Sequence, residues 1–237
     1  MSVDNLRTIY QRLHLIERAI VSTRVEIESM LAGDLKPRLS QRSIDVSNGL
    51  RKLFSRSDEI TEENIAPYME FSEGVCCAID RQYANFISIK TSVVEMFDHD
   101  GAAILGSCLH VSPVFDGVDA AQWATLEVDL DADEIRKASN IAIRFMPIFR
   151  FETQFKKPNL TMWVRLFKSE NEYIDLNVKS FPAVSSPIMF TYSDDFSKID
   201  SEILSNMVKA RVMIGLPIST SGQYEMIVSY FNTQVVI

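Results

Sequence analysis

Mostly hydrophobic residues recur through the first thirty positions of the chain at alternating intervals of three and four. The series is Leu6, Ile9, Leu13, Ile16, Ile20, Thr23, Ile27 and Met30. Polar or charged residues fill most positions between them, so the apolar seam takes two positions in seven, which is typical of a coiled coil. A helix that packs on a globular core usually has a wider apolar stripe. The spacing therefore predicts a coiled-coil helix over residues 4–32.

A second apolar seam over residues 38–60 does not continue the register of the first. Between the two seams, Gly33 favours the end of a helix and Pro37 cannot continue its hydrogen bonds. The chain either turns back as an antiparallel helical hairpin or continues as a kinked oligomeric stalk, unless the helices pack elsewhere. A homo-oligomer is expected for hairpin and stalk alike, because two helices alone leave apolar surface exposed. Leu and Ile at the seam positions favour a trimer if the helices form a parallel coil.

From residue 86 onward, hydrophobic and polar residues alternate, which is the period of a half-buried β-strand. About nine short strands follow one another, separated by turn residues such as Asp100-Gly101 and Lys157-Pro158-Asn159. No helix alternates regularly with these strands, so the pattern predicts two packed antiparallel sheets, a jelly-roll-like β-sandwich, with a closed barrel as the alternative. Residues 197–208 fit one short helix. Residues 68–84 have helical spacing and predict a helix that leads into the sandwich.

These patterns predict an α+β chain in two parts. Residues 1–60 are expected to form a helical, coiled-coil oligomerisation segment, and residues 61–237 an antiparallel β-sandwich that includes the helix at 68–84. The boundary is marked by a helix-capping threonine, two glutamates and a proline between Thr61 and Pro67.

Charge is distributed unevenly between the two parts. The chain has 24 basic and 32 acidic residues, a net charge of −8. Residues 61–237 carry a net charge of −10, against +2 for residues 1–60. Nucleic acid is not expected as a partner, because phosphate binding requires clustered Lys and Arg.

Membrane and export signals are not found in the sequence. No apolar run approaches the ~20 residues of a membrane-spanning helix, and the N-terminus has no continuous apolar stretch of the secretory type. The cysteines are Cys76, Cys77 and Cys108, an odd number that suits a disulfide framework poorly. A reducing, cytoplasmic location without a membrane span is therefore expected.

Common motifs for catalysis, cofactor binding and metal binding do not occur in the chain. The acidic run from Asp129 to Glu134 resembles a calcium loop. Glu134 and Asn140, however, stand where an EF-hand needs glycine and glutamate, so a capped turn is expected instead. Cys108 and His110 lie on one side of a predicted strand, where we expect a buried thiol beside a hydrogen-bonded histidine. Neither a cofactor nor a metal ion is predicted.

Aromatic residues alternate with charged residues on the predicted strands. Trp163 and Arg165 share one face of a strand, as do Tyr173 and Asp175, and Trp123 begins another strand. A sugar ring presents C–H groups to an aromatic face and hydroxyl groups to charged neighbours. These five residues are therefore the candidate ligand-binding residues, and packing of the rings in the core is the competing interpretation.

The leading hypothesis is a non-enzymatic oligomeric binding protein. The helices would set the number of linked sandwiches, and each sandwich would present a surface for a ligand, with carbohydrate favoured. A structural or assembly protein that binds other proteins is the first alternative. A saccharide-acting enzyme is the second, and it requires two carboxylates in one cleft. The candidate carboxylates are Glu127, Asp129, Glu152 and Asp175.

Overall fold

The computed structural model describes residues 43–45, 61–62, 68–80, 86–94, 106–115, 121–151, 155–186, 188–219 and 221–237. All of them belong to one compact unit, Arg42–Val94 with Gly106–Ile237. The other unit, Met1–Gln41 with Glu95–Leu105, lies outside the described residues, and so does the coiled-coil helix predicted over residues 4–32. Of the helix predicted over 38–60, the structure describes Ser43–Asp45 alone. There it has a strand, β1, paired with the last strand of the chain.

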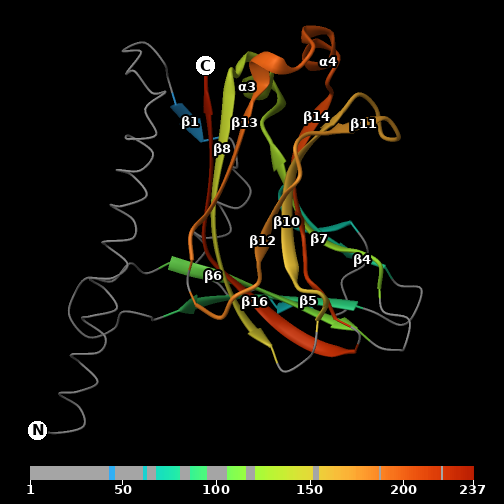
Figure 1. Ribbon diagram of the computed structural model, residues 1–237, viewed down its shortest axis with the longest axis vertical. Helices are drawn as coiled ribbons and strands as arrows, with labels where there is room; N and C mark the ends of the chain where they lie inside the picture. Colours follow the sequence, from blue (N-terminus) through green and yellow to red (C-terminus); the bar gives the residue numbers. More distant parts are fainter. Residues whose placement is uncertain are drawn as a thin grey trace, which may run out of the picture. The chain divides into compact units, whose positions relative to one another are not determined.

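Two antiparallel sheets make up the compact unit, one beside the other in Figure 1. In spatial order, sheet A consists of β13 (Phe190–Asp195), β8 (Asn140–Phe151), β16 (Gly222–Val236), β6 (Gly106–Phe115), β5 (Phe86–Val94) and β2 (Thr61–Glu62), with β1 also paired to β16. Sheet B consists of β11 (Tyr173–Asp175), β10 (Asn159–Phe167), β14 (Lys209–Gly215), β7 (Ala124–Leu130), β4 (Val75–Ile79) and β3 (Met69–Ser72), with β12 (Lys179–Pro182) also paired to β10. A short ribbon pairs β9 (Phe155–Lys157) with β15 (Ile218–Ser219). The predicted antiparallel sandwich is confirmed, and the closed barrel is not adopted.

Alternation along the strands places one side of each sheet in a shared core. The buried residues of β10 are Leu160, Met162, Val164 and Leu166, and the residues between them face outward. On β16 a bulge between Val228 and Tyr230 offsets the register by one residue, so the same side of the strand stays buried along its length. The core residues of β16 are Tyr224, Met226 and Val228 before the bulge, and Phe231, Thr233 and Val235 after it.

The helix predicted over residues 68–84 is wrong, because this part of the chain forms the antiparallel strands β3 and β4. Gly74 makes the turn between them with a φ of 68°, a left-handed conformation that residues with a Cβ rarely adopt. A Cβ on Gly74 would also lie 2.9 Å from the Cβ of Asp129. Val75 and Ile79 fit both a helical and an alternating pattern, and pairing with β7 decides for the strand.

Within the described ranges, three short helical turns lie between the strands. α3 (Ala132–Lys137) begins at Asp131, whose side chain accepts hydrogen bonds from two backbone N–H groups of the first turn, as expected for a capped turn. The single helix predicted over 197–208 is instead divided into a 3-10 turn, η1 (Phe196–Lys198), and the helix α4 (Ser201–Ser205). The division follows from the capping, because each piece begins at its own aspartate.

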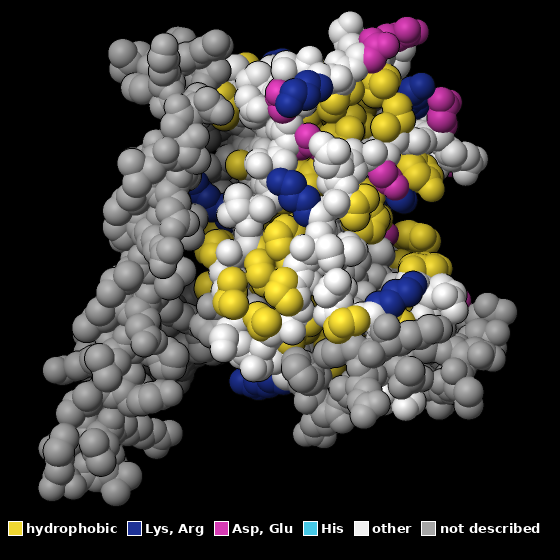
Figure 2. Space-filling view, viewed as in Figure 1, with side chains coloured by type: hydrophobic (Ala, Val, Ile, Leu, Met, Phe, Trp, Pro, Cys, Tyr) yellow, Lys and Arg dark blue, Asp and Glu magenta, His cyan; other side chains and the backbone are white. Residues whose placement is uncertain are grey.

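Hydrophobic side chains reach the surface near β12 and β13, where the two sheets end (Figure 2). Val178, just before β12, is 61% exposed, and Ile188, just before β13, is 41% exposed. Within the described part of the chain, no helix is long and apolar enough to cross a membrane.

Candidate functional site

The outward face of sheet B carries two adjoining rows of side chains across its strands. The first row, across β7, β14, β10 and β11, consists of Asp129, Arg211, Arg165 and Asp175. The second row, across β4, β7, β14 and β10, consists of Cys76, Glu127, Met213 and Trp163. Members of the two rows on the same strand are two residues apart, so they share one face of the sheet. Together these residues form the outer-face cluster.

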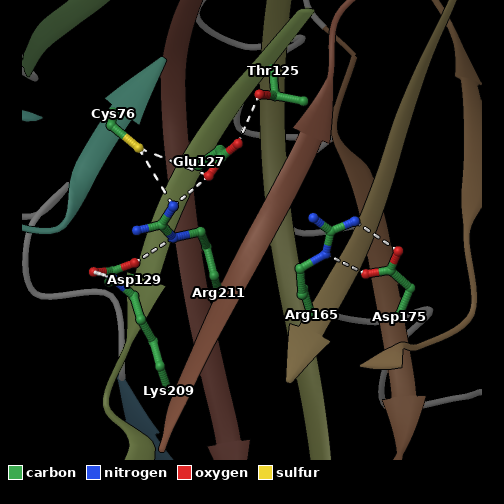
Figure 3. Close-up of polar contacts among 8 residues, drawn as sticks. All are labelled: Cys76, Thr125, Glu127, Asp129, Arg165, Asp175, Lys209 and Arg211. Atoms are coloured by element: carbon green, nitrogen blue, oxygen red, sulfur yellow. Dashed lines mark hydrogen bonds and ion pairs between the residues drawn. The ribbon is translucent and has the colours of Figure 1, made fainter. Parts of the chain in front are cut away.

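Arg211 lies at the centre of the buried half of this cluster (Figure 3). Its Nε donates to Oδ1 of Asp129 over 2.5 Å, and its Nη1 donates to Oε2 of Glu127. The other oxygen of Glu127 accepts a hydrogen bond of 2.9 Å from the Thr125 hydroxyl, and Lys209 Nζ lies 2.7 Å from Asp129. Glu127 is only 2% exposed. Because its charge is paired and hydrogen-bonded on both oxygens, this half of the cluster is a fixed base for the surface above it.

The Cys76 thiol completes the buried half. Its Sγ donates to Glu127 Oε2 over 3.8 Å and accepts from Arg211 Nη1 over 3.6 Å. Burial raises the pKa of Cys76 to about 12, and the nearby guanidinium of Arg211 offsets only part of this rise. A thiol with this pKa is protonated at neutral pH and does not act as a nucleophile.

We expect the stability of the protein to fall between pH 9 and 12 partly through Cys76. The pKa of this thiol is about 12 in the folded protein against an ordinary value of 9.0. Alkali therefore ionises the unfolded chain first, and stability present below pH 9 is lost as the pH rises. Urea unfolding is measured at pH 8 and at pH 10.5. Between these two pH values, the free energy of unfolding should fall by about 1 to 2 kcal/mol less in Cys76→Ala than in the wild type. Equal declines would contradict the assignment.

Arg165 and Asp175 form the exposed half of the cluster, and their side chains are 20% and 33% exposed. Arg165 Nε donates to Oδ1 of Asp175 over 2.6 Å and Nη2 donates to Oδ2 over 2.8 Å, so Nη1 donates to neither oxygen (Figure 3). The hydrogen bonds with Asp175 raise the pKa of Arg165, although its burial acts in the opposite direction. The guanidinium carbon lies 3.8 Å from the ring centroid of Tyr173, which is 47% exposed. An ion pair, a hydrogen-bond donor and a partly exposed aromatic ring therefore lie together.

Trp163 lies beside this exposed half, with its ring centroid 5.9 Å from the guanidinium carbon of Arg165. The indole ring packs over Gly215. A Cβ at position 215 would lie only 3.2 Å from Cζ3 of the indole, so the glycine makes room for the ring. The indole Nε1 is buried and makes no hydrogen bond with any described residue. Trp163 is thus half-buried and lies beside Arg165.

Trp123 lies at a different place on the same face. It lies just before β7, two residues from Thr125 and four from Glu127, so it shares their face of the sheet. Its ring stacks on that of Tyr68, with the centroids 6.4 Å apart and an interplanar angle of 24°. The two rings are 40% and 59% exposed. Tyr68 has a φ of 63°, and such a left-handed backbone costs a residue with a Cβ about 1–2 kcal/mol.

The structure therefore brings together four of the five predicted ligand-binding residues, namely Trp163, Arg165, Tyr173 and Asp175. Trp123 instead pairs with Tyr68. Sequence reasoning missed Tyr68, Cys76 and Arg211 as members of this face. The alternation of Lys209, Arg211 and Met213 could have indicated that Arg211 faces outward on its strand. No pattern in the sequence distinguished Tyr68.

Of the four carboxylates considered for hydrolysis, the structure describes Glu127, Asp129 and Asp175, and arginines pair with all three. Glu127 and Asp129 both bind Arg211, and Asp175 lies three strands from them, about 14 Å at ~4.8 Å per strand, well beyond the separation that glycosidases use. Glu152 lies outside the described residues. Among the residues that the structure describes, no three His, Cys, Asp or Glu side chains are placed to hold a metal ion.

Cys108 and His110, which the sequence placed on one side of a strand, lie on the outer face of sheet A in β6. Cys108 is a buried thiol, and Nδ1 of His110 lies 2.6 Å from Oε1 of Glu225. Arg150 bonds the other oxygen of Glu225 over 3.3 Å. His110 thus belongs to a surface ion-pair group, separate from the outer-face cluster of sheet B.

No family model matches the sequence, and no curated protein matches it. Several solved carbohydrate-binding modules align with it at low similarity. One of these, from a study of the promiscuous specificity of carbohydrate-binding modules of the β-sandwich superfamily, is 9% identical, with a TM-score of 0.46, and the alignment covers 68% of this chain and 56% of that one. A family 11 module from Clostridium thermocellum, in complex with a β-1,3-1,4-mixed-linked tetrasaccharide, is 13% identical, with a TM-score of 0.39 and coverage of 76% and 96%. The CBM22-1 xylan-binding domain from Paenibacillus barcinonensis is 8% identical, with a TM-score of 0.41 and coverage of 75% and 94%. At these scores the likeness assigns neither a ligand nor a binding site to this chain.

Proposed function

We propose that the outer face of sheet B binds a saccharide through Tyr173, Arg165 and Asp175. The observation that carries the proposal is the bidentate Arg165–Asp175 pair held 3.8 Å from the exposed ring of Tyr173. A sugar ring has apolar C–H groups on its faces and hydroxyl groups at its edge. An exposed aromatic ring contacts the first, and charged donors and acceptors beside the ring bond the second more strongly than neutral groups do.

Charge balance in the cluster favours a neutral, hydroxyl-bearing ligand. Three cations, Arg165, Lys209 and Arg211, pair with the carboxylates of Glu127, Asp129 and Asp175. An anionic ligand would have to compete with these carboxylates for the same cations. A hydroxyl group does not compete in this way, because it can donate to Asp175 and accept from Arg165 at the same time.

The arrangement also supports binding rather than hydrolysis. Tyr173 and Asp175 lie on β11, which pairs with β10. The buried hydrogen bonds of Arg211 hold together β14, the other neighbour of β10, and β7. Binding groups on paired strands lose little freedom when a ligand arrives, which favours affinity. The described carboxylates, in contrast, are held by arginines, and Asp175 lies too far from Glu127 and Asp129 to act with either as a catalytic pair. We propose that the segment before β1 links several such sandwiches, which would strengthen weak single-site binding.

Direct binding measurements test this function. The full chain is applied to a glycan array, and affinity for the best ligand is measured by titration calorimetry. Tyr173→Ala is expected to weaken binding about fivefold to tenfold, because an aromatic contact is worth about 1 kcal/mol. Tyr230→Ala is the matched control, since Tyr230 is 39% exposed and lies on sheet A. An array without any bound glycan, or equal losses in both variants, would contradict the proposal.

A further inference from the structure

Tyr68 combines a strained backbone with an exposed aromatic ring. It is the one residue other than glycine, among the described residues, with a positive φ. Its ring, however, is 59% exposed and stacks on Trp123, which is itself 40% exposed. Strained backbone persists where surrounding contacts favour it, and it is concentrated at ligand sites. Here two partly exposed rings stack at the surface, so an accessible aromatic pair lies at the strained position.

The Tyr68 side chain lies on the same face of sheet B as the outer-face cluster. Its backbone N–H donates to the carbonyl of Cys77 over 3.1 Å, which places it at the start of the β3–β4 ladder. Burial raises the pKa of Tyr68, Glu127 raises it further, and Arg165 and Arg211 act in the opposite direction. These charged groups come from three different strands of the outer face, so the phenol hydroxyl lies within electrostatic reach of both rows. Trp123 shares the face by its alternation with Thr125 and Glu127.

The two aromatic groups lie far apart on that face. Tyr173 is on β11, at one end of sheet B, whereas Trp123 precedes β7 and Tyr68 precedes β3 at the other end. Three strand spacings separate β11 from β7, about 14 Å at ~4.8 Å each. The strand register adds an offset along the strands of about 26 Å at ~3.3 Å per residue, because Tyr173 pairs with Phe167 and Phe167 with Lys209, whereas Trp123 lies beyond the pair Thr125–Gly215. A single sugar ring cannot contact both groups, but a chain of several sugars that runs obliquely across the strands can.

We propose that Tyr68 and Trp123 form a second stacking platform, so that the ligand is a linear oligosaccharide that spans the face from Tyr173 to Tyr68. This inference rests on the proposed saccharide function and specifies its ligand. The charged rows between the platforms face the hydroxyl groups along the chain, and each platform packs on one of its sugar rings.

An array of linear neutral oligosaccharides tests the inference. Glucose, mannose, galactose and xylose oligomers are each presented at lengths from one to six units, and the full chain is compared with Tyr68→Gly, Trp123→Ala and the control Tyr230→Ala. We expect wild-type affinity for at least one series to rise tenfold or more from the shortest to the longest oligomer. Tyr68→Gly and Trp123→Ala should lose at least tenfold on the longest oligomer and keep the affinity for the shortest.

Folding is checked separately from binding. Glycine tolerates the left-handed backbone at position 68, so the thermal midpoint of Tyr68→Gly should stay within a few degrees of the wild type. Tyr68→Asn serves as a second variant, because asparagine also adopts this conformation. Binding that depends on Tyr173 but not on oligomer length or on Tyr68 would overturn this inference and leave the proposed function intact. A wild-type protein that binds no oligomer would overturn both.

Discussion

Replacing Arg211 with methionine is expected to destabilise the protein by about 3 to 5 kcal/mol. The guanidinium is the partner of Glu127, which is 2% exposed, and it also bonds Asp129. Methionine fills a similar volume but leaves the Glu127 charge buried with the Thr125 hydroxyl as its remaining strong partner. Burying an unpaired charge costs far more than the pair contributes, so the loss should appear as a lower urea midpoint.

Two further variants distinguish charge burial from loss of packing. Arg150→Met removes an arginine whose side chain is 72% exposed and bonded to Glu225, and it should cost less than about 1 kcal/mol. The double variant Glu127→Leu with Arg211→Met removes both buried charges and should recover most of the lost stability. If Arg211→Met costs no more than Arg150→Met, the central role of Arg211 in the cluster is wrong.

The largest expected effect on binding comes from Arg165→Lys. Lysine keeps the positive charge but cannot make the two parallel hydrogen bonds to Asp175 or lie flat against Tyr173. Central arginine and tyrosine contacts often carry about 2 kcal/mol or more, so we expect affinity for the best glycan of the array to fall about thirtyfold.

Calorimetric titration and urea unfolding measured together check this result. Because the Arg165–Asp175 pair is partly exposed, the unfolding free energy should change by less than about 1 kcal/mol. Arg150→Lys, on sheet A, should leave both quantities unchanged. Full affinity in Arg165→Lys would show that the bidentate pair does not contact the ligand.

Local patterns predicted which side chains of the exposed half share a face of a strand. Trp163 and Arg165 are two residues apart on one strand, and Tyr173 and Asp175 are two apart on the next, so alternation alone placed each pair on one face. The turn between the strands is short, which makes them neighbours and sets Arg165 opposite Asp175. Every contact of this half lies within ten residues of sequence, so strand periodicity and one short turn bring its side chains together, and ligand binding by them stays a prediction.

The buried half of the site could not be predicted in the same way. Arg211 meets Glu127 across 84 residues and Cys76 across 135. Those contacts depend on β14 lying next to β7 and on β7 lying next to β4, an order that strand periodicity does not contain. The failed helix over residues 68–84 has a related cause, since Val75 and Ile79 satisfy both periods until a neighbouring strand pairs with them.

The amino-acid sequence by itself determined the alternating strands, the antiparallel sandwich and the aromatic-charged pairs on adjacent strands, because these follow from a period of two and from short turns. The tertiary structure alone decided which carboxylates are buried against Arg211, where Trp123 lies, and that Tyr68 adopts a strained backbone beside it. The physical reason is the order of the strands in sheet B. Side chains that share a face become neighbours only when their strands pair, and strand order is set by packing of the whole core rather than by any local pattern.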